Sequence, residues 1–374
     1  MSSSAFVSGP EFSFDRLRRI GWQPALFPAL AAAAGGDHAA WQAMRLTEVH
    51  RDQLRVHDGE AEHRARAAPA LLRALDAEGA ALAVGDWLLC AGESDGALWA
   101  QRRLEPLNHI ARRDADGRRH PVVSNVDTAL FVMGLDDDYN PRRLERYLLL
   151  AHGAGVRPVV VLTKADLVAP APAVREALVA DETDALRARI GPDVPLLAVN
   201  GTAPEAALAL APWLMPGQTV VLLGSSGAGK STLTNTLAGL SLQDTGAVRT
   251  HDSRGKHTTT ARTLHRLPGG ACVIDTPGLR ALRPDIDEAT LAQGFGDIER
   301  LAPRCRFRDC RHGDEPGCAV REAVAPDRLR NYHKLLRELK RDTMSVLERR
   351  QQLAQWKARG RAGGQRAKMK RAIG

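Results

Sequence analysis

Apolar residues along the chain occur in runs whose length and spacing change from one region to the next. Between residues 45 and 111, runs of four or five residues alternate with turn pairs such as Asp58-Gly59, Gly85-Asp86 and Asp95-Gly96. Short strands with such turns favour a small β-barrel, and about five strands in this length suit an OB-fold. A β-domain that only packs on its neighbour is the alternative.

From Asp127 onward the apolar runs alternate with longer amphipathic stretches. The pattern predicts strands at 128–133, 158–162, 195–199 and 219–223, and helices at 140–154 and 172–190. This alternation is typical of right-handed βαβ units on a parallel sheet, which bind ligands at the carboxyl ends of the strands.

The run at 219–223 leads into a glycine-rich stretch with the G-x-x-x-x-G-K-S spacing of a phosphate-binding loop. The stretch consists of Gly224, Ser225, Ser226, Gly227, Ala228, Gly229, Lys230, Ser231 and Thr232. The glycines let backbone N–H groups point at phosphate oxygens, and the following helix adds the positive end of its dipole. We expect Lys230 to reach the β- and γ-phosphates and the Ser231 hydroxyl to hold Mg²⁺.

Two more apolar runs end in residues that suit a guanine nucleotide. The run 271–274 ends in a D-x-x-G, in which Asp275 would bind Mg²⁺ through water and the Gly278 N–H would contact the γ-phosphate. The run 158–162 ends in Thr163, Lys164, Ala165 and Asp166. A carboxylate at this strand end accepts two hydrogen bonds from the guanine edge, which adenine does not offer. The sequence therefore predicts a GTP site.

These motifs occur in a rearranged order, because the base-recognition residues precede the phosphate loop. Ordinary GTPases have the phosphate loop first and the base motif last, whereas circularly permuted GTPases have the order found here. Permutation costs little when the original termini lie close together. One consequence is that the D-x-x-G segment leads directly into the C-terminal region, to which a γ-phosphate-dependent movement would be passed.

The C-terminal region contains a C-x₄-C-x-H-x₅-C pattern formed by Cys305, Cys310, His312 and Cys318. Three thiolates and an imidazole are the ligands of a closed tetrahedral zinc site, so we expect one structural Zn²⁺. Unrelated thiols beside a loop histidine are the alternative. The other two cysteines stand alone, which argues against a disulfide framework and for a reducing compartment.

Composition and charge indicate the kind of partner and the compartment. The chain has 374 residues, 44% of them apolar, and a formal net charge of +8, which favours a polyanionic partner such as RNA. No apolar run approaches the ~20 residues that span a membrane. Residues 357–374 are basic and contain no acid; they would contact RNA phosphates or merely solubilise the chain. We expect a cytoplasmic monomer.

Together, the barrel, the permuted motifs and the Cys/His pattern resemble the RsgA/YjeQ family of ribosome small-subunit-dependent GTPases, over roughly residues 45–339. The stretch Gly255-Lys256-His257-Thr258-Thr259-Thr260 resembles the family's switch. The resemblance implies hydrolysis of GTP to GDP and phosphate by a late-stage assembly factor of the small (30S) subunit, strongly stimulated by that subunit. It also implies contacts of the barrel and zinc domains with 16S rRNA, and departure after hydrolysis.

The sequence departs from the family pattern at two base-recognition positions. Thr163 stands where the family usually has Asn, which would loosen affinity or specificity for the nucleotide. Asn200-Gly201 stands where the family usually has Ser-Ala. We expect the Asn200 backbone N–H to contact guanine O6.

Leu279 follows the D-x-x-G, where Ras-like enzymes have a glutamine that orients the attacking water. Because leucine cannot orient water, intrinsic hydrolysis should be slow. His257 is the candidate replacement, ordered only on the ribosome, and lies beside Thr258 and Thr259, which we expect to coordinate Mg²⁺. A histidine that faces solvent or RNA is the alternative.

The predicted fold is multidomain α/β. It comprises an N-terminal helix and linker (1–40), with the helix at about 14–30, an OB-fold barrel (41–113), a circularly permuted P-loop GTPase domain (114–290), a zinc-binding helical domain (291–345) and a basic tail (346–374). Two other functions are considered: a non-catalytic, nucleotide-gated RNA-binding scaffold, and a P-loop ATPase acting on nucleic acid. The ATPase lacks a Walker B Asp-Glu, since Thr276 follows Asp275.

Overall fold

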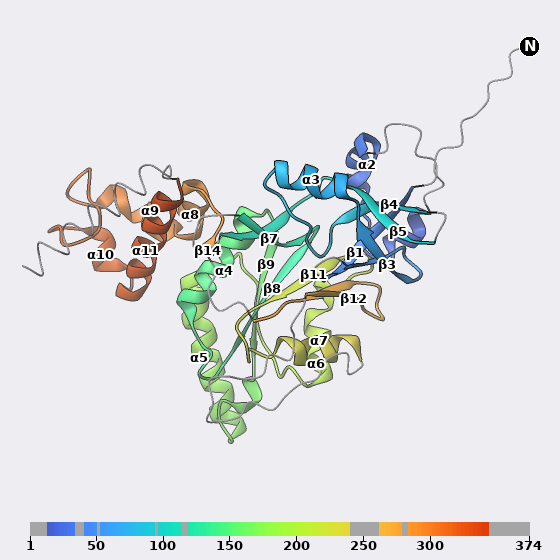
Figure 1. Ribbon diagram of the computed structural model, residues 1–374. Coiled ribbons are helices and arrows are strands. Elements are labelled where there is room, and N and C mark those ends of the chain that lie inside the picture. Colours follow the sequence, from blue (N-terminus) through green and yellow to red (C-terminus); the bar gives the residue numbers. More distant parts are fainter. Residues whose placement is uncertain are drawn as a thin grey trace, which may run out of the picture. The chain divides into compact units, whose positions relative to one another are not determined.

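The computed structural model divides into two compact units, Met1–Asp285 and Ile286–Gly374 (Figure 1). It describes residues 13–33, 41–50, 53–93, 96–113, 119–239, 262–278 and 283–343. The predicted switch residues His257, Thr258 and Thr259, as well as Leu279 and the predicted tail, lie outside the described residues. No helix in the described ranges is both long enough and apolar enough to cross a membrane.

Five strands near the N-terminus close into a barrel. Their order is β1-β2-β3-β5-β4, and β4 pairs back onto β1, so every strand has two neighbours within the barrel. The strands are β1 (Gln42–His50), β2 (Gln53–His57), β3 (Glu62–Ala67), β4 (Trp87–Gly92) and β5 (Leu98–Arg103). Helix α3 (Pro69–Ala77) contributes Leu71 and Leu75 to the barrel core. The predicted OB-like barrel is confirmed.

The segment before the barrel does not form the single helix expected at about 14–30. It forms α1 (Phe14–Arg18), the 3₁₀ turn η1 (Pro24–Leu26) and α2 (Phe27–Ala33). Gly21 has a φ of +89°, a left-handed conformation that ends the first helix. Trp22 is buried and lies edge-on against Trp87 of the barrel, with ring centroids 4.9 Å apart.

The central sheet has the order β10-β9-β8-β11-β13-β12, and β12 also pairs with β1 of the barrel at Glu48 and Thr263. Its strands are β8 (Thr128–Gly134), β9 (Arg157–Thr163), β10 (Leu196–Ala198), β11 (Thr219–Leu223), β12 (Thr263–Arg266) and β13 (Cys272–Asp275). The first five strands in this order are parallel, and β12 is antiparallel to β13. The predicted alternation of strands and helices is confirmed.

Helices cover both faces of this sheet, which explains why its parallel strands are mostly apolar. On one face Val160 and Leu162 share a core with residues of α4 (Pro141–Gly153) and α5 (Pro172–Ile190). On the other face Val159 and Val161 share a core with α6 (Pro204–Leu210) and α7 (Lys230–Ala238). The turn η3 (Ala211–Trp213) follows α6.

A small second sheet holds the chain where the first unit ends. Strand β6 (His109–Arg113) pairs with β7 (Arg119–Ser124) and with the short β14 (Arg283–Pro284). Asp285 then accepts ion pairs from Arg113 at 2.7 Å and Arg119 at 2.6 Å. The chain that follows the D-x-x-G segment is therefore fixed to the β6–β7 hairpin before it enters the second unit.

The second unit is helical, and its buried apolar residues in the described ranges are Leu291, Phe295, Ile298, Cys318, Val320, Val324, Leu329, Leu335 and Leu339. Its elements are α8 (Glu288–Gly294), α9 (Gly296–Leu301), η4 (Ala302–Arg304), α10 (Ala319–Ala323) and α11 (Pro326–Thr343). The buried Arg328 on α11 pairs with Asp297 at 2.7 Å and lies over the Phe295 ring, 4.5 Å from its centroid. This ion pair links α11 to α9.

Candidate functional site: a nucleotide site and a separate metal-ligand group

The predicted phosphate loop connects the carboxyl end of β11 to the start of α7. Gly227 and Gly229 have φ values of +83° and +92°, which L-residues with a side chain rarely adopt. Gly224 is required for a different reason, because a Cβ there would clash with the Val132 carbonyl oxygen. These three positions explain why glycine recurs in the loop.

Lys230 is the first residue of α7, and its side chain folds back over the loop. Its Nζ donates to the carbonyl oxygens of Gly224, at 3.1 Å, and Ser225, at 2.7 Å. Burial lowers the pKa of Lys230, and the carboxylates of Asp275 and Asp138 oppose this effect. A phosphate bound in the loop would likewise favour the charged ammonium.

The D-x-x-G residues lie directly beside the phosphate loop. Asp275 ends β13 and is fully buried, with one carboxylate oxygen 3.3 Å from the Ser231 hydroxyl. Thr276 donates to the Leu222 carbonyl at 2.7 Å, which ties this segment to β11. Gly278 approaches the loop so closely that a Cβ on it would clash with the Ser226 nitrogen. The structure thus brings together the two motifs that the sequence separates by about forty-five residues.

The base-recognition residues contact the phosphate loop from the end of β9, which is separated from β11 by β8. Thr163 is buried, and its hydroxyl donates to the Ala228 carbonyl at 2.6 Å. Lys164 has a φ of +62°, and its ammonium donates to the Gly227 carbonyl at 2.7 Å. Ala165 and Asp166 follow in the 3₁₀ turn η2 (Ala165–Leu167).

The predicted guanine-O6 residue lies in the loop after β10. The Asn200 side chain accepts hydrogen bonds from the backbone N–H and hydroxyl of Thr202, at 3.0 and 2.7 Å. The Gly201 carbonyl accepts from Thr236 on α7 at 2.7 Å. The backbone N–H of Ala165 donates to the Val199 carbonyl at 3.4 Å. These contacts hold the Asn200 loop beside both η2 and α7.

Sequence reasoning missed two carboxylates in the loop that follows β8. Asp136 pairs with the Lys164 ammonium at 2.6 Å, and Asp138 accepts a hydrogen bond from the Ser225 hydroxyl. A signal was present, since this loop follows the carboxyl end of a parallel strand next to β11. The sequence alone does not distinguish its three consecutive aspartates from those of an exposed acidic turn.

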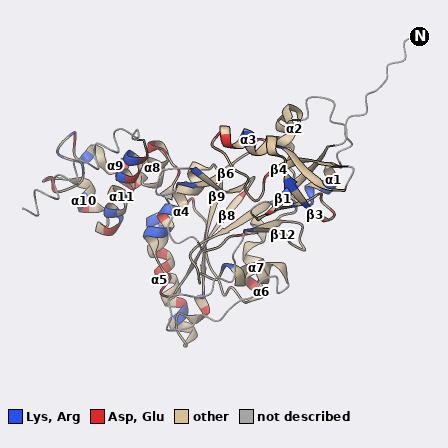
Figure 2. Cartoon of the chain, in the orientation of Figure 1, with Lys and Arg blue, Asp and Glu red and all other residues tan. Residues whose placement is uncertain are grey.

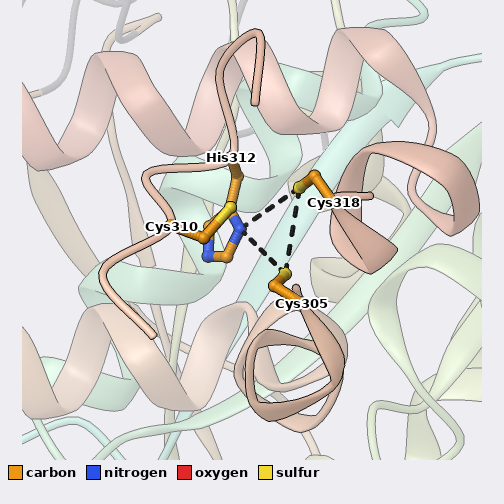
Figure 3. A group of neighbouring side chains, drawn as sticks. All are labelled: Cys305, Cys310, His312 and Cys318. Carbon is orange, nitrogen blue, oxygen red and sulfur yellow. Dashed lines mark hydrogen bonds between the residues drawn. The ribbon is translucent and has the colours of Figure 1, made fainter. Parts of the chain in front are cut away.

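A separate group of ligating side chains lies in the second unit. Cys305, Cys310, His312 and Cys318 place their ligand atoms within 4.8 Å of one another and point toward a common centre (Figure 3). The His312 Nδ1 is 3.6 Å from the Cys305 sulfur and 3.5 Å from the Cys318 sulfur. All four predicted residues are brought together, as a group that could hold a metal ion.

The two remaining cysteines are buried elsewhere, in β4 and β13. Burial raises the pKa of the Cys90 thiol to about 12 and raises that of Cys272 as well. Both therefore stay protonated near neutral pH and pack as small apolar side chains.

The fold and these motifs define a circularly permuted P-loop GTPase preceded by an OB-like barrel and followed by a Cys₃His unit. Comparison with known proteins agrees. Residues 104–284 match the RsgA GTPase family. The chain is 46% identical over 345 residues to the small ribosomal subunit biogenesis GTPase RsgA of Xanthomonas axonopodis pv. citri, covering 87% of this chain and 89% of that one. The chain belongs to the RsgA family of GTPases.

A second relative supports the same family, and two solved structures have a similar fold. The protein of the same name from Xanthomonas campestris pv. campestris is 46% identical over 335 residues, covering 86% of this chain and 88% of the relative. The fold resembles YjeQ from Thermotoga maritima, with a TM-score of 0.54, 24% identity, and coverage of 80% and 98%. It also resembles the circularly permuted GTPase YloQ, with a TM-score of 0.53, 23% identity, and coverage of 83% and 99%.

Proposed function

We propose that this GTPase is a late-stage assembly factor of the small (30S) ribosomal subunit, which binds 16S rRNA and is stimulated by the subunit. The observation that carries the proposal is the convergence of four loops on one sheet edge, in permuted order, within a family of small-subunit biogenesis GTPases. The protein would act in the cytoplasm, where ribosomal subunits mature, and as a monomer.

The described contacts support a role for each loop in binding GTP. Backbone N–H groups of residues 225–232 would hold the phosphates, with the buried Lys230 released from the Gly224 and Ser225 carbonyls to reach the β- and γ-oxygens. Asp166 would accept the guanine N1–H and N2–H₂, and the Lys164 stem would lie along the base. The Asn200 N–H would donate to guanine O6, and the Gly278 N–H would contact the γ-phosphate.

The oxygen atoms of Ser231 and Asp275 suit Mg²⁺, a hard cation that prefers oxygen ligands. They lie 3.3 Å apart at the end of β13, beside the loop expected to hold the phosphates. We assign the ion to Ser231 directly and to Asp275 through water, with Thr258 and Thr259 as further ligands. The ion would neutralise charge on the phosphates during hydrolysis.

The Cys₃His group suits a structural Zn²⁺. Two thiolates on one tetrahedral zinc, each about 2.3 Å from the ion, lie roughly 3.8 Å apart, and the Cys305 and Cys318 sulfurs are 3.9 Å apart. Four protein ligands leave no open position for a water or substrate. The ion would therefore stabilise the second unit without taking part in hydrolysis.

The charge of α11 supports RNA binding by the second unit. Its exposed side chains include Arg330, Lys334, Arg337 and Arg341, which are three or four residues apart and so share one face. Figure 2 shows basic residues in blue on α11. Such a stripe matches the charge of an RNA backbone and makes affinity fall with salt. The barrel would supply the other rRNA contact, as OB-folds commonly do.

Hydrolysis requires an activated water, for which we propose His257. An imidazole near neutral pH can orient or accept a proton from water, whereas Leu279 cannot. We expect subunit-stimulated turnover of His257→Ala to fall by about two orders of magnitude, the usual contribution of a general base. Undiminished stimulated turnover would exclude this residue.

The deciding experiment measures phosphate release from GTP and from ATP, each with and without purified small subunits. Stimulation confined to GTP supports the proposal. Equal turnover of both nucleotides, indifferent to subunits, contradicts it and favours a P-loop ATPase. Nucleotide-dependent RNA binding without turnover would indicate a non-catalytic scaffold.

A further inference from the structure

The loop between β8 and α4 contains three consecutive aspartates whose surroundings differ. The Asp138 carboxylate accepts from three segments: the Ser225 hydroxyl, the Gly134 backbone N–H at 3.2 Å and the Arg143 guanidinium at 2.5 Å. Its side chain is only 13% exposed. It therefore joins the phosphate loop to the end of β8 and the first turn of α4.

Asp136 makes a corresponding contact at the base-recognition end of the site. It pairs with the Lys164 ammonium at 2.6 Å, and the same ammonium donates to the Gly227 carbonyl at 2.7 Å. Asp137 lies between them, is exposed, and has neither an ion pair nor a hydrogen bond from its side chain within the described ranges. Two of the three carboxylates thus hold nucleotide-site loops.

We propose that Asp138 and Asp136 are positioning residues of the nucleotide site: Asp138 fixes the phosphate loop through Ser225, and Asp136 fixes Lys164. Neither carboxylate contacts the nucleotide. The inference deepens the proposed function, since it rests on GTP binding at this loop.

The charges of the two carboxylates are compensated, as a site for an anion requires. An unpaired carboxylate beside the phosphates would repel them, but Arg143 neutralises Asp138 and Lys164 neutralises Asp136. Asp138 also lies close enough to Lys230 to favour its charged form. Fixing Ser225 orders the loop before the ligand arrives, which reduces the entropy lost on binding.

The test compares Asp138→Asn with Asp137→Asn, a neighbouring variant with the same change of charge. GDP is titrated into each protein without ribosomes. We expect Asp138→Asn to bind GDP about tenfold more weakly, as expected for the loss of a charge-assisted hydrogen bond, and Asp137→Asn to bind like the wild type. Equal affinities for all three proteins would overturn the proposal, as would tighter binding by Asp138→Asn.

Kinetics separate positioning from a loss of folded protein. Positioning acts equally on bound substrate and transition state, so KM for GTP rises about tenfold while kcat stays within about twofold. Misfolding lowers the apparent kcat and leaves the affinity of the remaining folded molecules unchanged. A fall in kcat at constant GDP affinity would therefore contradict the proposal.

A double-mutant cycle tests whether Asp138 acts through Ser225. If it does, the double variant that combines Asp138→Asn and Ser225→Ala should bind GDP at most about twofold more weakly than whichever single variant has the lower affinity. If the two single losses of GDP affinity multiply in the double variant, Asp138 does not act through Ser225, and this part of the proposal is overturned. Because the binding measurements use GDP and no ribosomes, they can fail while subunit-stimulated hydrolysis of the wild type stands, and the reverse also holds.

Discussion

The two ligand-binding regions of this protein are built from the chain in opposite ways. The Cys₃His group draws all its side chains from fourteen consecutive residues, 305–318. The nucleotide site draws its residues from loops after five strands, β8, β9, β10, β11 and β13, spread over 136–278. The first depends on local spacing, and the second depends on the order of strands in the sheet.

This difference decides how each region responds to damage. We expect a metal ion held by these four side chains to supply much of the stability of this small helical unit, because the apolar core there is small. The nucleotide site lies on a large sheet with cores on both faces. Loss of one nucleotide contact should therefore weaken binding and leave the fold intact.

Metal removal should have the largest effect of these changes, and this effect should be the loss of folded structure in the second unit only. A chelator, or Cys310→Ser, is expected to abolish the helical signal of 286–343 in circular dichroism, because structural zinc supplies on the order of 10 kcal/mol to such folds. GDP affinity of the first unit should persist. Cys90→Ala, which removes a buried thiol outside the group, is the control and should retain one equivalent of zinc. Persistent helicity of zinc-free protein would show that the second unit folds on its core alone.

Lys230→Ala should produce the next largest effect, confined to the nucleotide site. We expect the buried ammonium to reach the phosphates, and removal of such a group typically costs on the order of 10²–10³ in turnover. Subunit-stimulated phosphate release and GDP binding are the measurements, and the thermal midpoint should change little. Lys334→Ala on α11 controls for loss of a positive charge in the GDP-binding measurement, which involves no ribosomes. Turnover like the wild type would place the phosphates elsewhere.

The motif residues of both regions can be predicted from the sequence, because the spacing or order of these residues along the chain determines that they come together in space. Strand ends on a parallel sheet converge, so the residue order alone predicts that Gly224–Thr232, Thr163–Asp166 and Asp275–Gly278 meet at one edge. The metal ligands follow from spacing alone. In both cases the residue types that suit the chemistry occur in a recognisable pattern along the chain.

The contacts between motifs were not predictable, because their partners come from distant segments. Arg45 shows why: it lies in a barrel strand and is fully buried. Its guanidinium donates to the Ile20 carbonyl at 2.5 Å and to the Thr219 hydroxyl and Asn125 carbonyl, both at 2.8 Å. An arginine in a short alternating strand suggests an exposed position. Only the packing of three segments around it supplies these three acceptors, and a single sequence does not specify that packing.

Thr163→Val should lower GDP affinity moderately, because it removes a contact between two loops of the nucleotide site. The change keeps the shape of the side chain but removes the hydroxyl that donates to the Ala228 carbonyl at 2.6 Å. A lost buried hydrogen bond of this kind costs about 1–2 kcal/mol, or roughly five- to thirtyfold in GDP affinity if the loop depends on it. Thr163→Ser keeps the donor and should bind GDP within about threefold of the wild type. Equal binding by both variants would show that the threonine does not hold the phosphate loop.

Asp285→Ala should give the smallest effect, because the side chain pairs with Arg113 and Arg119 of the β6–β7 hairpin, and none of the described nucleotide-site residues comes from that hairpin. Arg113 and Arg119 would lose their shared acceptor, but both are partly exposed, so the free energy of unfolding should fall by only about 1 kcal/mol or less. Hydrogen exchange should quicken in β6 and β14, whose pairing Asp285 extends, while GDP affinity stays constant. Asp184→Ala, which removes an exposed partner of Arg187 on α5, is the matched control. A fall in GDP affinity for Asp285→Ala but not for Asp184→Ala would contradict this expectation. It would mean that the β6–β7 hairpin and the D-x-x-G segment act as one element, so that a change in the hairpin affects the nucleotide site.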